Sequence, residues 1–244
     1  MLYLIGLGIE IKDLSLNALE CIKKCRKVYL ENYTSIGCSL NDLKRLIKKE
    51  IVIAEREIIE NCQDKILNEA KKQDIAILVY GDPLIATTHI NYIIDAQKIG
   101  VKTRVVHNVS IFNAVTETGL MIYNFGKTAS IPFDNENIKT PIKIIKNNLK
   151  MGLHTLILLD LDPKNNKFLT INNALEYLMK NNFLDKRCIT CVSLGKKNQK
   201  IKYGKIKDLI KLNFKNFPQC IIVPGKLHFR EEEALKLYNI EENH

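Results

Sequence analysis

The chain has 244 residues, of which 46% are hydrophobic and 26% charged, a balance typical of folded globular proteins. Its formal net charge is +10, but only 6 of its 37 basic residues are arginine, and the lysines are spread along the chain, which argues against a dedicated nucleic-acid surface. No apolar run reaches the roughly 18 residues of a membrane span, and the N-terminus lacks the features of a secretory signal. We therefore expect a cytoplasmic globular protein without a membrane segment.

The first half of the sequence alternates strand and helix patterns with short connections. Alternation of this kind predicts a mainly parallel sheet with helices on its faces. Ser15 and Ser110 are suited to cap two of the helices, and Gly100 to end another. The expected strands are 2–8, 28–33, 51–55, 75–80 and 101–108, and the expected helices are 15–27, 40–50, 65–73, 89–100 and 110–120.

Beyond residue 126 the strands are more frequent and some follow one another directly, which predicts a mixed sheet. The change of character divides the chain into two predicted α/β domains, 1–120 and 121–244, with a ligand cleft between them. The expected strands are 128–133, 153–162, 188–194, 200–204 and 219–225, and the expected helices are 141–152, 172–181, 205–212 and 230–238.

The seven cysteines are odd in number and scattered, as is usual for reduced thiols in a reducing compartment. Cys188 and Cys191 have CxxC spacing but lie in an expected strand, and no second ligand pair accompanies them. Cys21 and Cys25 are one helical turn apart and are interpreted as small core residues. The five histidines, His89, His107, His154, His228 and His244, also lack metal-ligand spacing, so no metal site is predicted.

The most informative segment is LVYGDPLIATTH, residues 78–89. A buried strand there leads into a Gly81-Asp82-Pro83 turn and a polar cluster, at the end of a strand where open parallel sheets bind ligands. The alternative is an ordinary connection in which Thr87 or Thr88 caps the following helix.

Other expected strands also end in polar loops, at 107–111, 159–160 and 224–228. The Gly6-Leu7-Gly8 loop is incomplete as a dinucleotide motif because Ile11 replaces its third glycine. No acid–base, nucleophile or metal motif accompanies these loops, a pattern that favours a reaction driven by positioning.

Several motifs recur together in one known family. The chain resembles the diphthine synthases, S-adenosylmethionine-dependent methyltransferases of the tetrapyrrole methylase superfamily that act on translation elongation factor 2. The resemblance covers nearly the whole chain, and it rests on YLENYTS (29–35), GDPLIATTH (81–89), HNVSIFNAV (107–115), YNFGKTASIPF (123–133), GLHTLILLDLD (152–162) and IIVPGKLH (221–228).

The resemblance implies a two-domain tetrapyrrole-methylase-like α/β fold, a homodimer, and S-adenosyl-L-methionine bound in the cleft and released as S-adenosyl-L-homocysteine. It also implies repeated methylation of the amino group of a 3-amino-3-carboxypropyl chain on a histidine of elongation factor 2. Tyr203 stands where the family usually has a small residue, and Ser193 with Lys196 where an arginine-containing loop is common. The cofactor contacts carry over onto Ile9, Asp82, Ile85, Ser110, Ile111, Leu159, Tyr203 and His228.

Two other functions compete with this hypothesis. Another enzyme of the superfamily would methylate a corrinoid precursor or ribosomal RNA. A non-catalytic nucleotide- or RNA-binding module would account for the positive charge and the Gly6-Leu7-Gly8 loop. Binding of S-adenosylmethionine separates the second of these from a methyltransferase.

Overall fold

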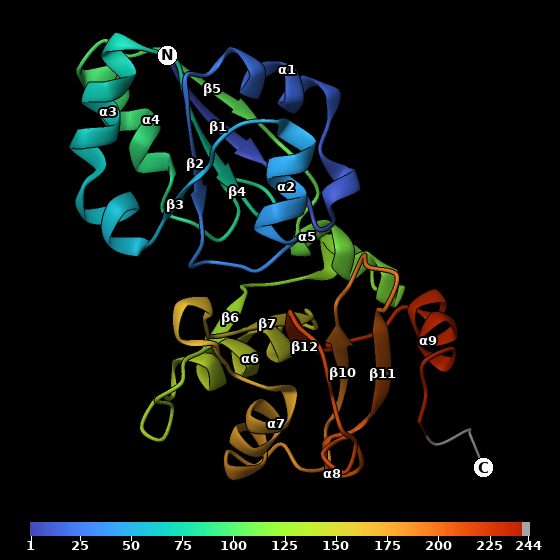
Figure 1. The fold of residues 1–244 in the computed structure, drawn as a ribbon. Helices are drawn as coiled ribbons and strands as arrows, with labels where there is room; N and C mark the ends of the chain where they lie inside the picture. The colour runs from blue at the N-terminus through green and yellow to red at the C-terminus, as the bar shows by residue number, and fades with distance from the viewer. Residues whose placement is uncertain (241–244) are drawn as a thin grey trace. The chain divides into compact units, whose positions relative to one another are not determined.

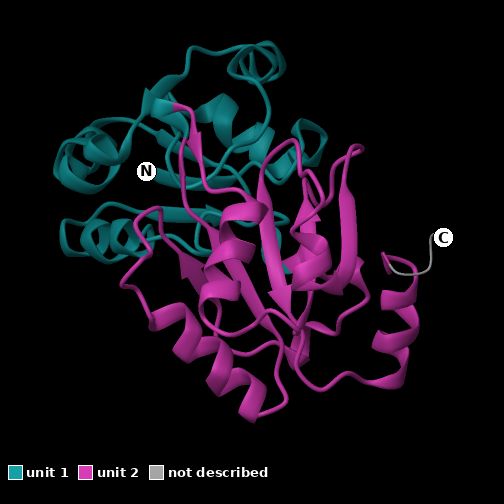
Figure 2. Cartoon of the chain, turned by 90° about the horizontal axis from the view of Figure 1, so that it is seen from below, with its two compact units in different colours: residues 1–112, 163–165 teal, residues 113–162, 166–244 magenta. Residues whose placement is uncertain are grey.

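The computed structural model describes residues 1–240, so His244 lies outside it. The chain forms two compact units (Figure 2). Unit 1 consists of Met1–Phe112 and Pro163–Asn165, and unit 2 consists of Asn113–Asp162 and the residues from Asn166 onward. The domain limits 1–120 and 121–244 stay a prediction.

Unit 1 is built on a five-stranded parallel sheet in the order β3-β2-β4-β1-β5 (Figure 1). The parallel sheet predicted from the alternating pattern is thus confirmed. Because all five strands run the same way, their carboxyl ends lie at one edge of the sheet. The strands are β1 Leu2–Gly6, β2 Lys27–Glu31, β3 Val52–Ala54, β4 Ile75–Val79 and β5 Thr103–Val106.

Helices cover both faces of this sheet (Figure 1). Alternate residues of β1 point to opposite faces, so Tyr3 and Ile5 pack with the core that includes α1 and α2, while Leu2 and Leu4 pack with the core that includes α3 and α4. The helices are α1 Leu16–Lys24, α2 Leu40–Ile47, α3 Gln63–Lys72 and α4 Ile90–Lys98, with a 3-10 turn η1 Ile11–Asp13 and a π-helical turn η2 Glu57–Asn61.

Two local expectations in unit 1 are confirmed. Ser15 caps α1, accepting a hydrogen bond from Ala18 N at 3.1 Å. Cys21 and Cys25 are buried in the core beside α1.

Unit 2 contains a mixed sheet in the order β11-β10-β12-β7-β6, in which only the β6–β7 pair is parallel. Both the mixed sheet and its place in the second half of the chain are confirmed. The strands are β6 Ala129–Ile131, β7 Thr155–Leu159, β10 Arg187–Val192, β11 Lys200–Lys205 and β12 Gln219–Val223.

The remaining elements pack beside this sheet or connect to it. The chain enters unit 2 through α5 Ile111–Ala114 and the 3-10 turn η3 Val115–Thr118. The main core lies between the sheet and the two helices α6 and α7. The helices and turns are η4 Ile122–Asn124, α6 Thr140–Lys150, η5 Pro163–Asn165 (in unit 1), α7 Ile171–Lys180, α8 Ile206–Leu209 and α9 Phe229–Lys236.

The strand expected over 153–162 is shorter than predicted. β7 ends at Leu159, and Asp160 then bends the chain, accepting hydrogen bonds from Leu161 N at 3.0 Å and Phe133 N at 3.3 Å through its carboxylate. A small antiparallel hairpin follows, β8 Leu161–Asp162 and β9 Lys167–Phe168. The bend could not be predicted from the sequence, because the apolar pattern of the strand continues beyond it with Leu161.

The CxxC pair lies in β10, where both thiols are buried. Burial raises the pKa of the Cys188 thiol, and a hydrogen bond with Cys220 together with burial raises the pKa of Cys191. Thiols that stay protonated are poor nucleophiles and poor metal ligands. Among residues 1–240, no helix combines the length and the apolar character needed to cross a membrane.

Candidate functional site

Three loops meet at the carboxyl edge of the unit 1 sheet. They follow β1, β4 and β5, which are neighbours because β1 lies between the other two. Gly8, after β1, and Gly81, after β4, exchange backbone hydrogen bonds of 3.2 and 2.9 Å. This edge, where loops from adjacent parallel strands converge, is the usual ligand position in open α/β sheets.

Glycine allows the first two loops to approach this closely. A Cβ atom on Gly6 would lie 2.6 Å from Gly81 O and 2.9 Å from Asn108 Cβ. Gly81 itself has φ of +79°, a conformation that favours glycine. Glycine at these positions therefore lets the loops after β1 and β4 lie backbone against backbone.

The Asp82 carboxylate ties the loop after β4 to the loop after β5. It is buried, and it accepts hydrogen bonds from Leu84 N at 2.9 Å, Asn108 N at 3.1 Å and His107 Nδ1 at 2.8 Å. A carboxylate held by three donors keeps its position. Asp82 thus fixes the shape of the loop, whereas the sequence assigned it only a contact with the cofactor.

Asn108 joins the same edge and was missed from the sequence. Its side-chain amide donates to Gly6 O and to Asp13 O, both at 3.0 Å. The Asp13 carboxylate in turn accepts from Ile9 N and Glu10 N, both at 2.8 Å. The asparagine was visible in the HNVS motif, but its partners lie about 100 residues away in sequence, so no local pattern reveals them.

The other predicted contacts of unit 1 lie on the same loops. Ile85 is half-buried, and its N–H donates to Asp82 O at 3.4 Å. Ser110 is buried beside Gly81, and its hydroxyl accepts from Phe112 N at 3.3 Å; Ile111 follows it as the first residue of α5. Ile9, Asp82, Ile85 and Ser110 therefore lie in loops at one edge of the sheet, and Ile111 begins the helix that follows one of these loops.

The alternative for the Thr-Thr-His segment is wrong in one respect. His89, not Thr87 or Thr88, precedes the first turn of α4, and its side chain makes no capping hydrogen bond. The Thr87 hydroxyl instead donates to Pro83 O at 2.8 Å. Thr87 thus shapes the GDP loop, and the Thr88 hydroxyl donates to Glu60 Oε1 at 3.4 Å.

The three predicted contacts of unit 2 do not form one cluster within that unit. Tyr203 is level with Leu156, near the beginning of β7, according to the strand register. Leu159 is three residues further along β7, about 10 Å at the rise of a strand. His228 follows β12, whose last residue pairs with the first residue of β7.

Tyr203 already uses its main-chain polar groups. Its N–H donates to Tyr238 O at 2.8 Å, and its carbonyl accepts from Ile240 N at 3.0 Å. The Arg187 guanidinium lies 5.3 Å from the centre of its ring. A ligand contact at Tyr203 would therefore be made by the side chain.

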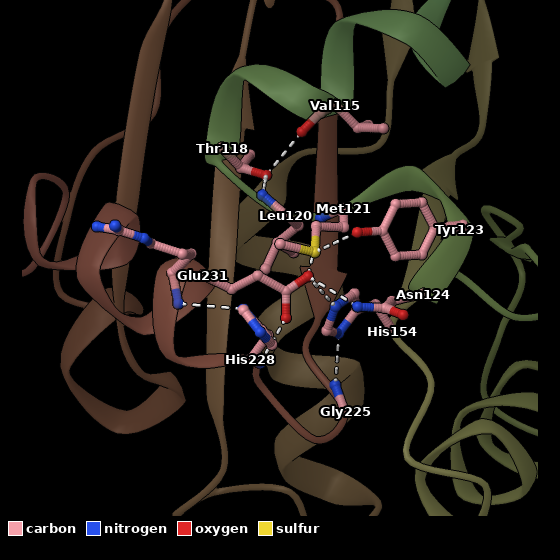
Figure 3. Close-up of polar contacts among 11 residues, drawn as sticks. Val115, Thr118, Leu120, Met121, Tyr123, Asn124, His154, Gly225, His228 and Glu231 are labelled. Carbon is pink, nitrogen blue, oxygen red and sulfur yellow. Dashed lines mark hydrogen bonds and ion pairs between the residues drawn. The ribbon is translucent and has the colours of Figure 1, made fainter.

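A buried polar network holds the segment that carries His228 (Figure 3). At its centre is Glu231, which has no exposed surface. One carboxylate oxygen accepts from Met121 N at 2.8 Å, His154 Nε2 at 3.1 Å and Asn124 Nδ2 at 3.2 Å, and the other accepts from His228 N at 2.8 Å.

His154 completes the network. It is also fully buried, and its Nδ1 accepts from Gly225 N at 2.9 Å, so Nε2 carries the ring proton and donates it to Glu231. The YNFG, GLHT and PGKLH motifs thus meet at one carboxylate. Neither His154 nor Glu231 was predicted, although an acid three residues after His228 is a capping-box signal.

Burial alone would raise the pKa of Glu231. The hydrogen bonds from His228, Met121, His154 and Asn124 outweigh it and hold the pKa of Glu231 below its ordinary value. The carboxylate is therefore charged at neutral pH, and its charge is met by protein donors.

Comparison with known proteins gives one family. A model of the tetrapyrrole (corrin/porphyrin) methylases matches residues 1–210. The chain is 40% identical to a protein named diphthine synthase from Methanococcus maripaludis, and 41% identical to one from Methanocaldococcus jannaschii; each comparison covers 97% of this chain and 98% of the relative.

The fold agrees with the sequence relatives. A crystal structure of diphthine synthase superposes with a TM-score of 0.92 at 33% identity, covering 98% of this chain and 96% of the other. The two-sheet α/β fold predicted from the sequence is therefore confirmed. Members of the tetrapyrrole methylase family use S-adenosylmethionine as methyl donor. This chain belongs to the tetrapyrrole methylase family and, within it, to the diphthine synthases.

Proposed function

We propose that the protein binds S-adenosyl-L-methionine and repeatedly methylates the amino group of the 3-amino-3-carboxypropyl chain on a histidine of translation elongation factor 2. The observation that carries this proposal is the full-length similarity to proteins named diphthine synthase. The carboxyl edge of unit 1, with its joined glycine loops, supports it as a place for the cofactor.

The residues proposed to hold the cofactor are those carried over from the family. In unit 1, glycine residues bring the loops after β1 and β4 together, and Asp82 with Asn108 keeps them in place. In unit 2, the Glu231 network orients His228. The contacts are Ile9, Asp82, Ile85, Ser110 and Ile111 in unit 1, and Leu159, Tyr203 and His228 in unit 2.

The cofactor supplies an activated methyl group. Transfer of this group leaves S-adenosyl-L-homocysteine as the product. The protein then has to align the acceptor nitrogen with that carbon and exclude water, which lowers the barrier mainly through positioning. The rigid parallel sheet beneath the loops suits this task, because each loop is anchored at a strand end.

Cofactor binding gives the first test. At about 100 times its Kd, S-adenosylhomocysteine should stabilise the folded protein by about 2.7 kcal/mol. For a chain of this size the melting temperature should rise by about 5–10 °C. Differential scanning fluorimetry measures the shift, and ATP serves as a control. A shift with ATP but none with S-adenosylhomocysteine would favour the nucleotide-binding module instead.

The acceptor gives the second test. Labelled methyl groups from S-adenosylmethionine should appear on elongation factor 2 that carries the unmethylated intermediate, and mass spectrometry should count more than one methyl group per molecule. Elongation factor 2 with the acceptor histidine replaced is the matched control and should stay unlabelled. Labelling of a corrinoid precursor or ribosomal RNA alone would refute the proposed substrate.

We further propose that the protein works as a homodimer in the cytoplasm. The family resemblance supports the dimer, and the seven free cysteines fit a reducing compartment. Light scattering after size-exclusion chromatography should give twice the 28.0 kDa of one chain.

A further inference from the structure

His107 is an exposed histidine at the carboxyl edge of the unit 1 sheet. It directly follows Val106, the last residue of β5, and its side chain is 68% exposed. Its Nδ1 donates to the Asp82 carboxylate at 2.8 Å, and the Asp82 side chain is only 4% exposed. A ring that is open to solvent is thus held on one side by a buried acceptor from the loop after β4.

The hydrogen bond to Asp82 determines which ring nitrogen is available. Asp82 also accepts from Leu84 N and Asn108 N, so its carboxylate acts as an acceptor and Nδ1 of His107 carries the ring proton. The two nitrogens lie on different sides of an imidazole ring, so Nε2 faces away from Asp82. Among residues 1–240, Nε2 makes no hydrogen bond and no ion pair. It is therefore free to accept a proton from a bound molecule.

His107 lies among the residues proposed to contact the cofactor. Asp82 is hydrogen-bonded to the ring, and Ser110 follows it by three positions in the same loop. Asn108, the next residue, donates to Gly6 O at 3.0 Å and so joins this loop to the loop after β1. A proton acceptor at His107 would therefore lie beside the proposed cofactor contacts of unit 1.

Methylation of an amine needs a proton acceptor. An aliphatic amino group has an ordinary pKa of about 8 to 10, so it is mostly protonated near neutral pH, and the ammonium form has no electron pair with which to attack a methyl carbon. Each round breaks one S–C bond, forms one C–N bond and releases one proton. Because the new C–N bond leaves the nitrogen positively charged, a second methyl group requires the loss of another proton.

We propose that His107 is the proton acceptor of the reaction, its Nε2 taking a proton from the acceptor ammonium before each methyl transfer. The inference rests on the proposed function, in which the ammonium belongs to the 3-amino-3-carboxypropyl chain. The nitrogen electron pair freed in this way forms the C–N bond, and the electrons of the S–C bond stay on sulfur. Asp82 orients the ring and lies beside the positive charge that the ring gains. Because the ring is exposed, water can remove the proton before the next round.

His107→Asn separates the two roles of the ring. The asparagine amide can replace Nδ1 as the donor to Asp82, but it supplies no group that takes up a proton. Near pH 7, the single-turnover rate of methyl transfer to modified elongation factor 2 should fall about 100-fold or more, whereas the Kd of S-adenosylhomocysteine, measured by calorimetry, should stay within about twofold. Lys102→Gln, an exposed position just before β5, is the matched control and should change neither value.

The pH dependence of the rate distinguishes a proton acceptor from a residue that only supports the loop. As the pH rises from about 7 to 10, the amine loses its proton to water and no longer needs a base. The ratio of the wild-type rate to the His107→Asn rate should therefore fall toward one. Asp82, which contacts the ring, and Asp13, which is linked to this loop through Asn108, are present in both proteins. A ratio that stays constant over this range would overturn the proposal.

The other outcomes separate this inference from the proposed function. Equal rates of wild type and His107→Asn near neutral pH would overturn the inference alone. A variant whose rate returns to the wild-type value at saturating S-adenosylmethionine would assign His107 to cofactor binding, and would also overturn it. Absence of methyl transfer by the wild-type protein would refute the proposed function itself.

The tautomer of His107 provides a readout that is independent of activity. Nuclear magnetic resonance of ¹⁵N-histidine-labelled wild-type protein at alkaline pH should show the ring proton of His107 on Nδ1 and none on Nε2. The His107→Asn spectrum assigns the resonances by their disappearance. A proton on Nε2 would leave no acceptor facing away from Asp82 and would contradict the proposal.

Discussion

Replacing Glu231 with alanine should lower the free energy of unfolding by about 3–5 kcal/mol, the range for removing one partner from a buried charged network. Four donors, from Met121, Asn124, His154 and His228, would lose their common acceptor in the interior of unit 2. Unfolding in urea, followed by circular dichroism, measures the loss.

Two variants calibrate this result. Glu231→Gln keeps the size and one carbonyl acceptor, so it should cost less than the alanine variant. Glu232→Ala removes the neighbouring exposed carboxylate on the same helix and should stay within about 0.5 kcal/mol of wild type. Equal stabilities of Glu231→Ala and Glu232→Ala would mean that the network does not stabilise the fold.

The stability of the protein should also depend on pH through the Glu231 carboxylate. The folded-state pKa of Glu231 lies below its ordinary value of about 4.3, so the unfolded chain binds its proton first as the pH falls. The stabilisation is therefore complete above about pH 5 and is lost as the pH falls through the folded-state pKa. The free energy of unfolding in urea should be measured between about pH 3 and pH 6. As the pH falls, it should decrease more steeply in wild type than in Glu231→Gln. Identical slopes would contradict the assignment.

Replacing Asp82 with alanine should affect both stability and cofactor binding. Leu84 N, Asn108 N and His107 Nδ1 would lose their acceptor, at a cost of about 1–3 kcal/mol in unfolding free energy. Because Asp82 holds two of the loops proposed to bind the cofactor, the Kd of S-adenosylhomocysteine should rise about tenfold or more. Calorimetry measures the Kd, and urea unfolding measures the stability.

His107→Ala provides the matched comparison for Asp82. The His107 side chain is 68% exposed, and its removal takes away one of the three donors while leaving the backbone bonds of Asp82 in place. The unfolding free energy of His107→Ala and its affinity for S-adenosylhomocysteine should therefore lie between those of wild type and Asp82→Ala. Unchanged affinity in Asp82→Ala would contradict the role of Asp82 in shaping the site.

Local sequence patterns were sufficient for most elements of the fold. The continuous apolar run from Leu2 to Ile5 predicts a strand buried on both faces, and Ser15 marks the start of α1 through a hydrogen bond to a residue three positions away. The GDP turn was also recognised as a loop at the carboxyl edge of the parallel sheet, and its use by a ligand stays a prediction. Elements without such a pattern were missed, among them the π-helical turn Glu57–Asn61 and the short hairpin after Asp160.

The sequence by itself therefore determined the two α/β sheets, the loops at the strand ends and, through whole-chain resemblance, the family. Only the tertiary structure decided which polar groups meet: Asp82 with Asn108, 26 residues apart, and His154 with Glu231, 77 residues apart. Within the part of the chain that the structure describes, it likewise leaves His89 Nε2 buried without a hydrogen-bond partner. The physical reason is that helices and strands follow from neighbours within a few positions, whereas the partners of a buried polar group depend on strand order and packing, which bring distant segments together.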